Sequence, residues 1–167
     1  HTASKYTQPG LWAYLDKLPK ESLPAFMRGD CAYGNEQMMR EAESRGLKYL
    51  FKLRQSSNVK KLIYKAFAQG EWVSAGKGWE GSNQTLTLNG WTKSRRVIVL
   101  RRRLKDGVVL SNEQQDLQLE LAFIDLYSGA EKYEYAVLVT SLPDEVLTIA
   151  QHYRDRADIE NVFDEMK

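Results

Sequence analysis

Apolar residues at helical spacing mark the first predicted element of the chain. Between residues 9 and 18, apolar side chains recur three or four positions apart, which favours a short amphipathic helix. These residues are Leu11, Trp12, Leu15 and Leu18. The preceding residues, 1–8, are polar and are expected to lack regular structure.

A strand, a helix and a second strand are predicted next. Residues 23–30 form an apolar run that ends in charge, as a buried strand does, and 48–54 form a second strand. The segment between them, 35–47, has helical spacing, with Asn35 positioned to cap its start and Gly46 its end. This order predicts a βαβ unit with parallel strands and a right-handed crossover.

Short alternating segments with glycine-rich breaks predict a mostly antiparallel β-region from about 70 to 140. A short helix is expected just before it, over 59–67. The candidate strands are 71–75, 84–88, 95–103, 118–127 and 132–140. A glycine-containing break separates the last two strands, which predicts a hairpin.

A long helix is predicted over the last segment, 143–167. Pro143 suits its first turn, and Asp144 and Glu145 follow at the positive end of the helix dipole. Strands and helices therefore alternate in the first part of the chain and a helix closes it, which favours the α/β class.

Composition excludes several classes of protein. The chain has 167 residues, of which 43% are apolar, enough for a core and too many for a mainly disordered protein. It lacks a run of about 18 apolar residues, so no membrane span is expected. A lone cysteine, Cys31, fits a reducing compartment. Only His1 and His152 are histidines, so a zinc cluster is not expected.

The last predicted helix has an unusual polar stripe. At about 100° per residue, Tyr153, Arg156, Glu160 and Lys167 fall within an arc of about 60°, on the side that carries apolar residues upstream. A carboxylate on an inward face indicates a metal ligand or a buried ion pair. The alternative is a solvated stripe in which Glu160 pairs with Arg156.

A second acidic residue, Asp30, follows the first predicted strand and precedes a helix. The carboxyl edge of a parallel sheet is where α/β folds bind ligands. Two other interpretations are open. Asp30 could cap the helix that follows. Arg28, Gly29 and Asp30 also spell a cell-adhesion tripeptide, which requires an exposed loop that the apolar strand argues against.

These two segments together resemble the DDE transposases of the insertion-sequence-four superfamily. Tyr153, Arg156, Glu160 and Lys167 match the spacing of that group's "YREK" signature, and 26–36 resembles its second-Asp motif. The motif residues are Arg28, Asp30, Cys31, Tyr33 and Gly34, with Cys31 where many relatives have Ser.

The resemblance implies a fold and a domain division. It implies a partial ribonuclease H-like fold of the α/β class, with a β-rich insertion before the last helix. On this basis residues 1–68 form the first part of the core, 69–141 the insertion, and 142–167 the final helix of the core.

The resemblance also implies a catalytic site that lacks one acid. Asp30 and Glu160 would be the second and third metal-binding carboxylates, and Tyr153, Arg156 and Lys167 would contact DNA phosphates. Asp16 lies in a helical segment and is not assigned as the first acid. We expect that acid, and the first strands of the fold, upstream of His1 or on another chain. A fragment with two of three carboxylates is expected to be inactive alone.

Two divalent ions about 4 Å apart suit phosphodiester chemistry, and Mg²⁺, or Mn²⁺ in its place, prefers carboxylate oxygens. The expected partner is DNA, at transposon ends and target, with a homodimer in a synaptic complex. The expected location is the bacterial cytoplasm, at the nucleoid.

Residues 93–105 contain seven Lys or Arg and no acid. In a strand, Arg95, Arg101 and Arg103 would share one face, and Arg96 and Arg102 would share the other. Both faces could therefore track a phosphate backbone. A charged edge strand that prevents aggregation is an equal alternative. The same region contains Trp72, Trp79 and Trp91. The resemblance implies that a tryptophan of this region stacks a base at the transposon end, and core packing is the alternative for each of them.

Three functional hypotheses follow. The first is a transposase catalytic domain that cleaves DNA ends and transfers strands with divalent metal. The second is a degenerate, non-catalytic DNA-binding domain of the same fold. The third is a ribonuclease H-like nuclease that cuts DNA without joining it.

Overall fold

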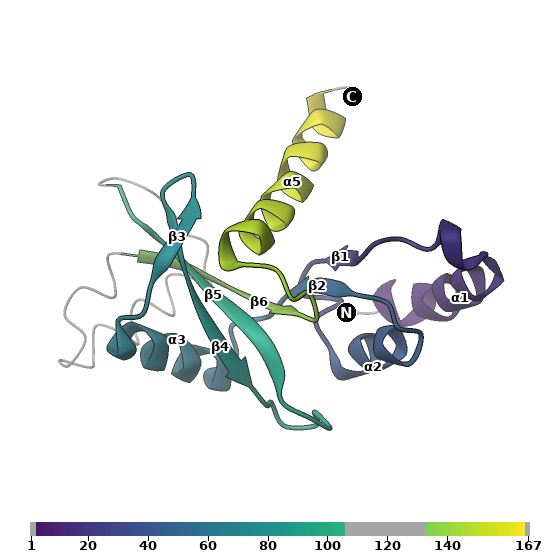
Figure 1. Ribbon diagram of the computed structural model, residues 1–167, viewed down its shortest axis with the longest axis horizontal. Helices are drawn as coiled ribbons and strands as arrows, with labels where there is room; N and C mark the ends of the chain where they lie inside the picture. The colour runs from purple at the N-terminus through teal and green to yellow at the C-terminus, as the bar shows by residue number, and fades with distance from the viewer. Residues whose placement is uncertain (1–2, 106–132, 166–167) are drawn as a thin grey trace.

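A computed structural model describes the backbone of residues 3–105 and 133–165, and the side chains of 8–105 and 133–155 (Figure 1). In chain order the elements are α1 (Ala3–Lys17), η1 (Lys20–Ser22), β1 (Met27–Gly29), α2 (Glu36–Ser44), β2 (Tyr49–Lys52), α3 (Ser57–Gln69), β3 (Val73–Gly76), β4 (Trp79–Leu86), β5 (Arg95–Arg103), β6 (Tyr133–Thr140) and α5 (Val146–Glu165). None of the described helices is both long enough and apolar enough to cross a bilayer.

One mixed sheet organises the described chain. Its six strands lie in the order β1-β2-β6-β5-β4-β3. Strands β1 and β2 are parallel and are joined through α2, which confirms the predicted βαβ unit. The pairs β3–β4, β4–β5 and β5–β6 are antiparallel, as predicted for the 70–140 region. Strand β6 also pairs antiparallel with β2. The candidate strand 118–127 and its hairpin lie outside the described residues.

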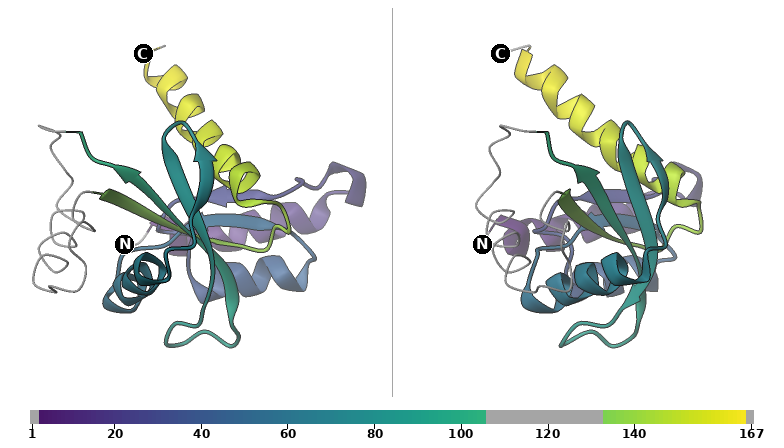
Figure 2. Two further views of the ribbon diagram at one scale, coloured as in Figure 1. Left: turned by 60° about the vertical axis from the view of Figure 1, so that its left-hand side comes forward. Right: turned by 90° about the vertical axis from the view of Figure 1, so that its left-hand side faces the viewer.

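Helices cover both faces of the sheet. Helices α1, α2 and α3 lie on one face and α5 on the other (Figures 1 and 2). Strand β5 serves both layers because its side chains alternate: Val97 and Val99 join the first core, whereas Ile98 and Leu100 join the core under α5. The structure is therefore of the mixed α/β class, as predicted.

Local signals explain where the helices end. The Asn35 side chain accepts a hydrogen bond from the Met38 amide at 3.0 Å, so it caps α2 as predicted. Gly46 follows α2 with a φ of 67°, a conformation that glycine adopts without strain. Helix α1 contains the helix predicted over 9–18 but begins earlier, at Ala3, so the prediction of irregular structure before residue 9 was wrong.

The start of β4 was also predicted wrongly. The strand begins at Trp79, not at residue 84, and includes Gly81. A Cβ at Gly81 would lie 2.3 Å from Cγ1 of Val146 in α5. The glycine therefore permits close approach of a helix to a strand, whereas its sequence context had indicated a break.

The sheet is continuous across the predicted domain boundary near residue 69. Strand β6 pairs with β2 on one side and with β5 on the other. The division of the chain into a core and an insertion remains a prediction.

A buried ion-pair network fastens α2 to β5. Arg95, only 4% exposed, donates to Glu36 at 2.6 Å and to Glu43 at 2.8 Å. Tyr49 and Lys93 also reach the Glu43 carboxylate, at 2.8 and 3.0 Å. Desolvation raises the pKa of Glu43, but the hydrogen bonds from Arg95, Tyr49 and Lys93 outweigh it and lower the pKa to about 2.

This network predicts a specific loss of stability in acid. The pKa of Glu43 is about 2 in the folded protein, compared with the ordinary glutamate value of 4.5 that applies in the unfolded chain. The stabilisation is therefore complete above about pH 4.5 and is lost as the pH falls towards 2. We expect Glu43→Gln to lower the unfolding free energy at pH 7 by about 3 kcal/mol, because it leaves Arg95 incompletely paired. It should also flatten the stability profile between pH 4.5 and 2.

Thermal denaturation followed by circular dichroism across that pH range measures both effects. Glu21→Gln, which changes an exposed carboxylate, is the control and should alter stability by less than about 0.5 kcal/mol. Equal pH profiles for Glu43→Gln and the unaltered protein would contradict the assignment.

Candidate active site

Asp30 lies immediately beyond β1, at the carboxyl end of the parallel strand pair. Its side chain is exposed, and Oδ1 accepts a hydrogen bond from the Ala32 amide at 2.9 Å. The N-cap of α2 is Asn35, so the interpretation of Asp30 as the helix cap is wrong. Asp30 therefore stands at the edge where the fold class binds ligands.

The loop that carries Asp30 is held tightly by its two glycines. A Cβ at Gly29 would lie 2.7 Å from Cβ of Tyr33, and one at Gly34 would lie 2.5 Å from the Lys52 carbonyl oxygen. Tyr33 in turn lies against Phe51, with ring centroids 6.5 Å apart. The glycines of the motif thus let the loop fold back onto the end of β2.

Arg28 and Gly29 lie in β1, and the Arg28 guanidinium reaches α5. Nη1 of Arg28 donates to the His152 carbonyl at 2.7 Å. The cell-adhesion interpretation needed these residues in an exposed loop, and this placement contradicts it.

Helix α5 is held at its first three turns and then continues away from the sheet (Figure 1). Val146 packs on Gly81, and Arg154 donates to the Ala75 carbonyl at 2.6 Å. Tyr153 is half-buried against the core beneath the helix.

The other predicted residues of the stripe are not described in the same detail. Arg156 and Glu160 belong to the helical backbone of α5, but their side chains lie outside the described residues. Lys167 lies outside them altogether. The described structure therefore gives no separation between the Asp30 and Glu160 carboxylates, and their pairing stays a prediction.

The site was tested for its fit to a divalent metal. Among the side chains of 8–105 and 133–155, no three His, Cys, Asp or Glu residues are grouped to hold an ion. Asp30 supplies hard oxygen at an exposed position on a rigid loop, which suits Mg²⁺ or Mn²⁺. Among the described side chains, Asp30 is therefore one candidate ligand, and a bound divalent ion would need further ligands besides it.

Strand β5 does not bear out the edge-strand interpretation, because it lies between β6 and β4. Arg95 is buried in the network with Glu36 and Glu43, so we withdraw it from the predicted DNA-binding residues. The sequence of 93–105 shows seven cations but does not show which of them the fold buries.

Two other arginines of β5 are also engaged inside the protein. Arg96 donates to the carbonyls of Leu142 and Asp144, at 2.7 and 2.8 Å, and so fixes the loop before α5. Burial lowers the pKa of its guanidinium. Arg101 donates to Glu80 at 2.7 Å and lies 3.9 Å from the Trp72 ring centroid. Both contribute to packing through these contacts.

Comparison with known families gives a match that spans almost the whole chain. The profile described as Transposase DDE domain group 1 matches residues 4–167. The chain belongs to the family of DDE transposase domains. Comparison with curated proteins finds no match. Family membership implies DNA as a partner and the use of divalent metal that is general among DDE transposases.

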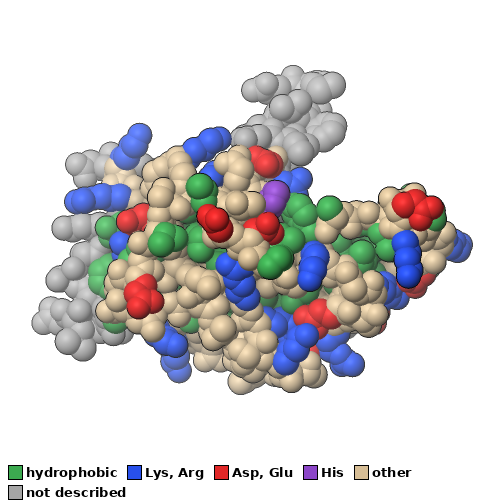
Figure 3. All heavy atoms as spheres, viewed as in Figure 1, with side chains coloured by type: hydrophobic (Ala, Val, Ile, Leu, Met, Phe, Trp, Pro, Cys, Tyr) green, Lys and Arg blue, Asp and Glu red, His purple; other side chains and the backbone are tan. Residues whose placement is uncertain are grey.

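A group of exposed cations of the transposase domain lies where β5 ends. Arg102, Arg103 and Lys105 line an open pocket together with Lys77 from the turn between β3 and β4. We call these four residues the basic surface. Lys and Arg side chains over this part of the molecule are visible at the upper left of Figure 3.

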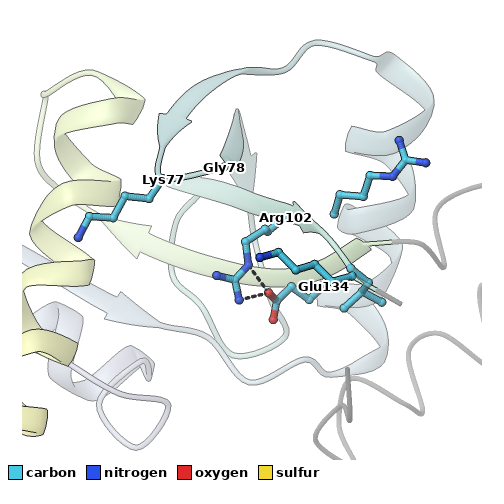
Figure 4. A pocket seen from close by; sticks show the side chains of 7 residues that line it. Lys77, Gly78, Arg102 and Glu134 are labelled. Carbon is cyan, nitrogen blue, oxygen red and sulfur yellow. Dashed lines mark hydrogen bonds and ion pairs between the residues drawn. The ribbon is translucent and has the colours of Figure 1, made fainter. Parts of the chain in front are cut away.

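The basic surface is spread out. Figure 4 shows Arg102 paired with Glu134, which also lines the pocket, while Lys77 extends away from that pair. A dispersed set of cations suits an extended polyanion better than a small anion. Sequence analysis missed Lys77, although its position between two glycines indicates a tight turn.

Each tryptophan of the β-region of the transposase domain lies under an arginine. The distance from the arginine Cζ atom to the ring centroid is 3.9 Å for Arg101 and Trp72. It is 4.9 Å for Arg102 and Trp79, and 5.3 Å for Arg95 and Trp91. All three rings are half-buried and pack against the cores. Base stacking on any of them would require an arginine to move.

The tight loop at Asp30 predicts the effect of a small substitution. Gly34→Ala would place a methyl group 2.5 Å from the Lys52 carbonyl oxygen, so the loop must shift. We expect a loss of about 1–3 kcal/mol of stability, measured by urea denaturation. Gly10→Ala, at a helical position with no atom within 4 Å of the new Cβ, is the control and should keep or raise stability. Unchanged stability of Gly34→Ala would show that the loop is loose.

Proposed function

We propose that the chain is the part of a transposase catalytic domain that carries the second and third metal-binding carboxylates, Asp30 and Glu160. The proposal extends to the insertion-sequence-four superfamily, a ribonuclease H-like fold and activity in end cleavage and strand transfer. Its main support is that a strand ending in an exposed Asp lies against the helix that bears the "YREK" spacing.

In this proposal Asp30 and Glu160 would hold Mg²⁺ or Mn²⁺. When bound, the metal activates the attacking oxygen and stabilises the leaving oxygen of the phosphodiester. Asp30 is suited to this role because its loop is closely packed: Gly34 lies against the backbone of β2, and the Ala32 amide donates to Oδ1. A fixed ligand loses little freedom on binding the ion.

Cations of this chain would hold the DNA on either side of the metals. Arg156 and Lys167, with Tyr153, would contact phosphates near the cleaved bond, as the resemblance implies. The basic surface lies at the end of β5 and at the turn between β3 and β4, and β2 and β6 separate β5 from β1, so its contacts would be to more distant phosphates. Such contacts orient DNA without reading sequence.

Several wider features belong to the same proposal. The first catalytic Asp is expected on sequence upstream of residue 1 or on another chain. A homodimer in a synaptic complex and a bacterial nucleoid location are also proposed. Each follows from the resemblance and none is needed for the experiments below.

The carboxylates are tested by substitution in the intact transposase. We expect Asp30→Asn and Glu160→Gln each to reduce metal-dependent cleavage of the element's own DNA ends by more than about 100-fold, because each removes a ligand. DNA binding in gel-shift assays should persist. Asp16→Asn is the control. It changes an acid of α1 that pairs with Arg45, on the face of the sheet opposite to α5, and this variant should cleave DNA at the normal rate.

The same assay separates the alternatives. Cleavage at the unaltered rate by Asp30→Asn would refute the proposal. An intact protein that binds ends but never cleaves them would be a degenerate domain. Cleavage without joining of ends to target DNA would indicate a nuclease.

The basic surface is tested by the salt dependence of DNA binding. Arg103→Gln with Lys105→Gln removes two exposed cations. The negative slope of log K against log salt should therefore become shallower, by up to about 0.9 for each lost phosphate contact. Lys61→Gln with Lys65→Gln removes two exposed cations of α3 that do not line the pocket, and should leave the slope unchanged. Equal slopes for the two double variants would exclude this surface.

A further inference from the structure

A joint between β1 and α5 connects the strand of Asp30 with the last helix. Nη1 of Arg28 donates to the main-chain carbonyl of His152 at 2.7 Å, across 124 positions of sequence. Beside it, the rings of Phe26 and His152 lie 4.7 Å apart between centroids. The Cζ atom of Arg28 is 5.8 Å from the Phe26 ring, so all three side chains belong to one contact.

The joint contacts α5 at a point where small changes of angle have large effects. Glu160 follows His152 by eight residues, which is about 12 Å of helix at 1.5 Å per residue. A tilt of about 10° at His152 would therefore move the helix at position 160 by about 2 Å. Productive metal and catalytic geometries tolerate only about 0.5 Å.

The other contacts of α5 lie on the remaining strands, and its apolar core extends to Leu50 of β2. Val146 packs on Gly81 of β4, and Arg154 donates to the Ala75 carbonyl of β3. Those strands lie at the opposite side of the sheet from β1. Arg28 adds a direct contact from β1 itself, two residues before Asp30.

We propose that Arg28 is a positioning residue, which sets the orientation of α5 relative to Asp30 through the His152 carbonyl. The inference rests on the proposed metal site of Asp30 and Glu160. A helix carbonyl already bonded within the helix has a second lone pair, which a charged donor can use without breaking the helix. The guanidinium reaches it from a short strand whose end is pinned by Gly29 and Gly34.

The test measures metal binding and DNA cleavage separately in the intact transposase. Mn²⁺ affinity is measured by calorimetry in the absence of DNA. We expect Arg28→Gln to weaken Mn²⁺ binding about tenfold, as loss of outer-shell partners does, and to lower kcat for end cleavage. The Kd for DNA should be unchanged. Arg28→Lys keeps the charge and should restore part of the Mn²⁺ affinity.

Arg45→Gln is the matched control. It removes an arginine that joins α1 to α2 through Asp16 and Glu41, far from α5. It should lower Tm without changing Mn²⁺ affinity. If Arg28→Gln behaves in the same way, with a lower Tm and unchanged Mn²⁺ affinity, Arg28 is only structural and the proposal is overturned.

Two further measurements keep the test decisive. Should Arg28→Gln fail to fold, Phe26→Leu loosens the same joint more gently and must weaken Mn²⁺ binding in the same direction. A folded Phe26→Leu with normal affinity would also overturn the proposal. Asp30→Asn is measured in parallel: normal Mn²⁺ affinity there refutes the metal site itself, whereas loss there with normal affinity in Arg28→Gln refutes only the positioning role.

Discussion

The pairing of β6 with β2 is the contact on which the rest of the structure depends. Thr140 Oγ1 donates to the Tyr49 carbonyl at 2.8 Å, and the Tyr49 amide donates to Ser141 Oγ at 3.0 Å. These bonds fix the register where β6 ends. Because α5 starts five residues after Ser141, the same register sets where the last helix meets the sheet, and Arg28 of β1 can reach His152.

Strand β5 illustrates how burial, more than charge, decides what an arginine does. A guanidinium inside the sheet layers must be paired, and Arg95 and Arg101 meet carboxylates there. Arg96 instead meets backbone carbonyls. Beyond the covered part of the strand, Arg102 and Arg103 are exposed. One uniform basic segment thus divides into structural cations and a surface suited to a polyanion.

The candidate site was predictable in part. Asp30 was expected at the end of a parallel strand, since an apolar run, a helix and another strand follow a simple periodic pattern. Asn35 was recognised as the cap by its residue type. The joint of Arg28 with His152 was not predictable, because it links residues 124 positions apart and uses a backbone carbonyl that sequence does not reveal.

Sequence by itself determined the βαβ unit, the antiparallel strands, the final helix and the acids that define the proposal, because periodicity and motif spacing are local properties of the chain. Tertiary structure alone decided that Gly81 lies within a strand, that Arg95 is buried and that Lys77 joins the basic surface. The reason is physical: the role of a glycine or a charged side chain depends on the elements packed against it, and those elements come from distant parts of the chain.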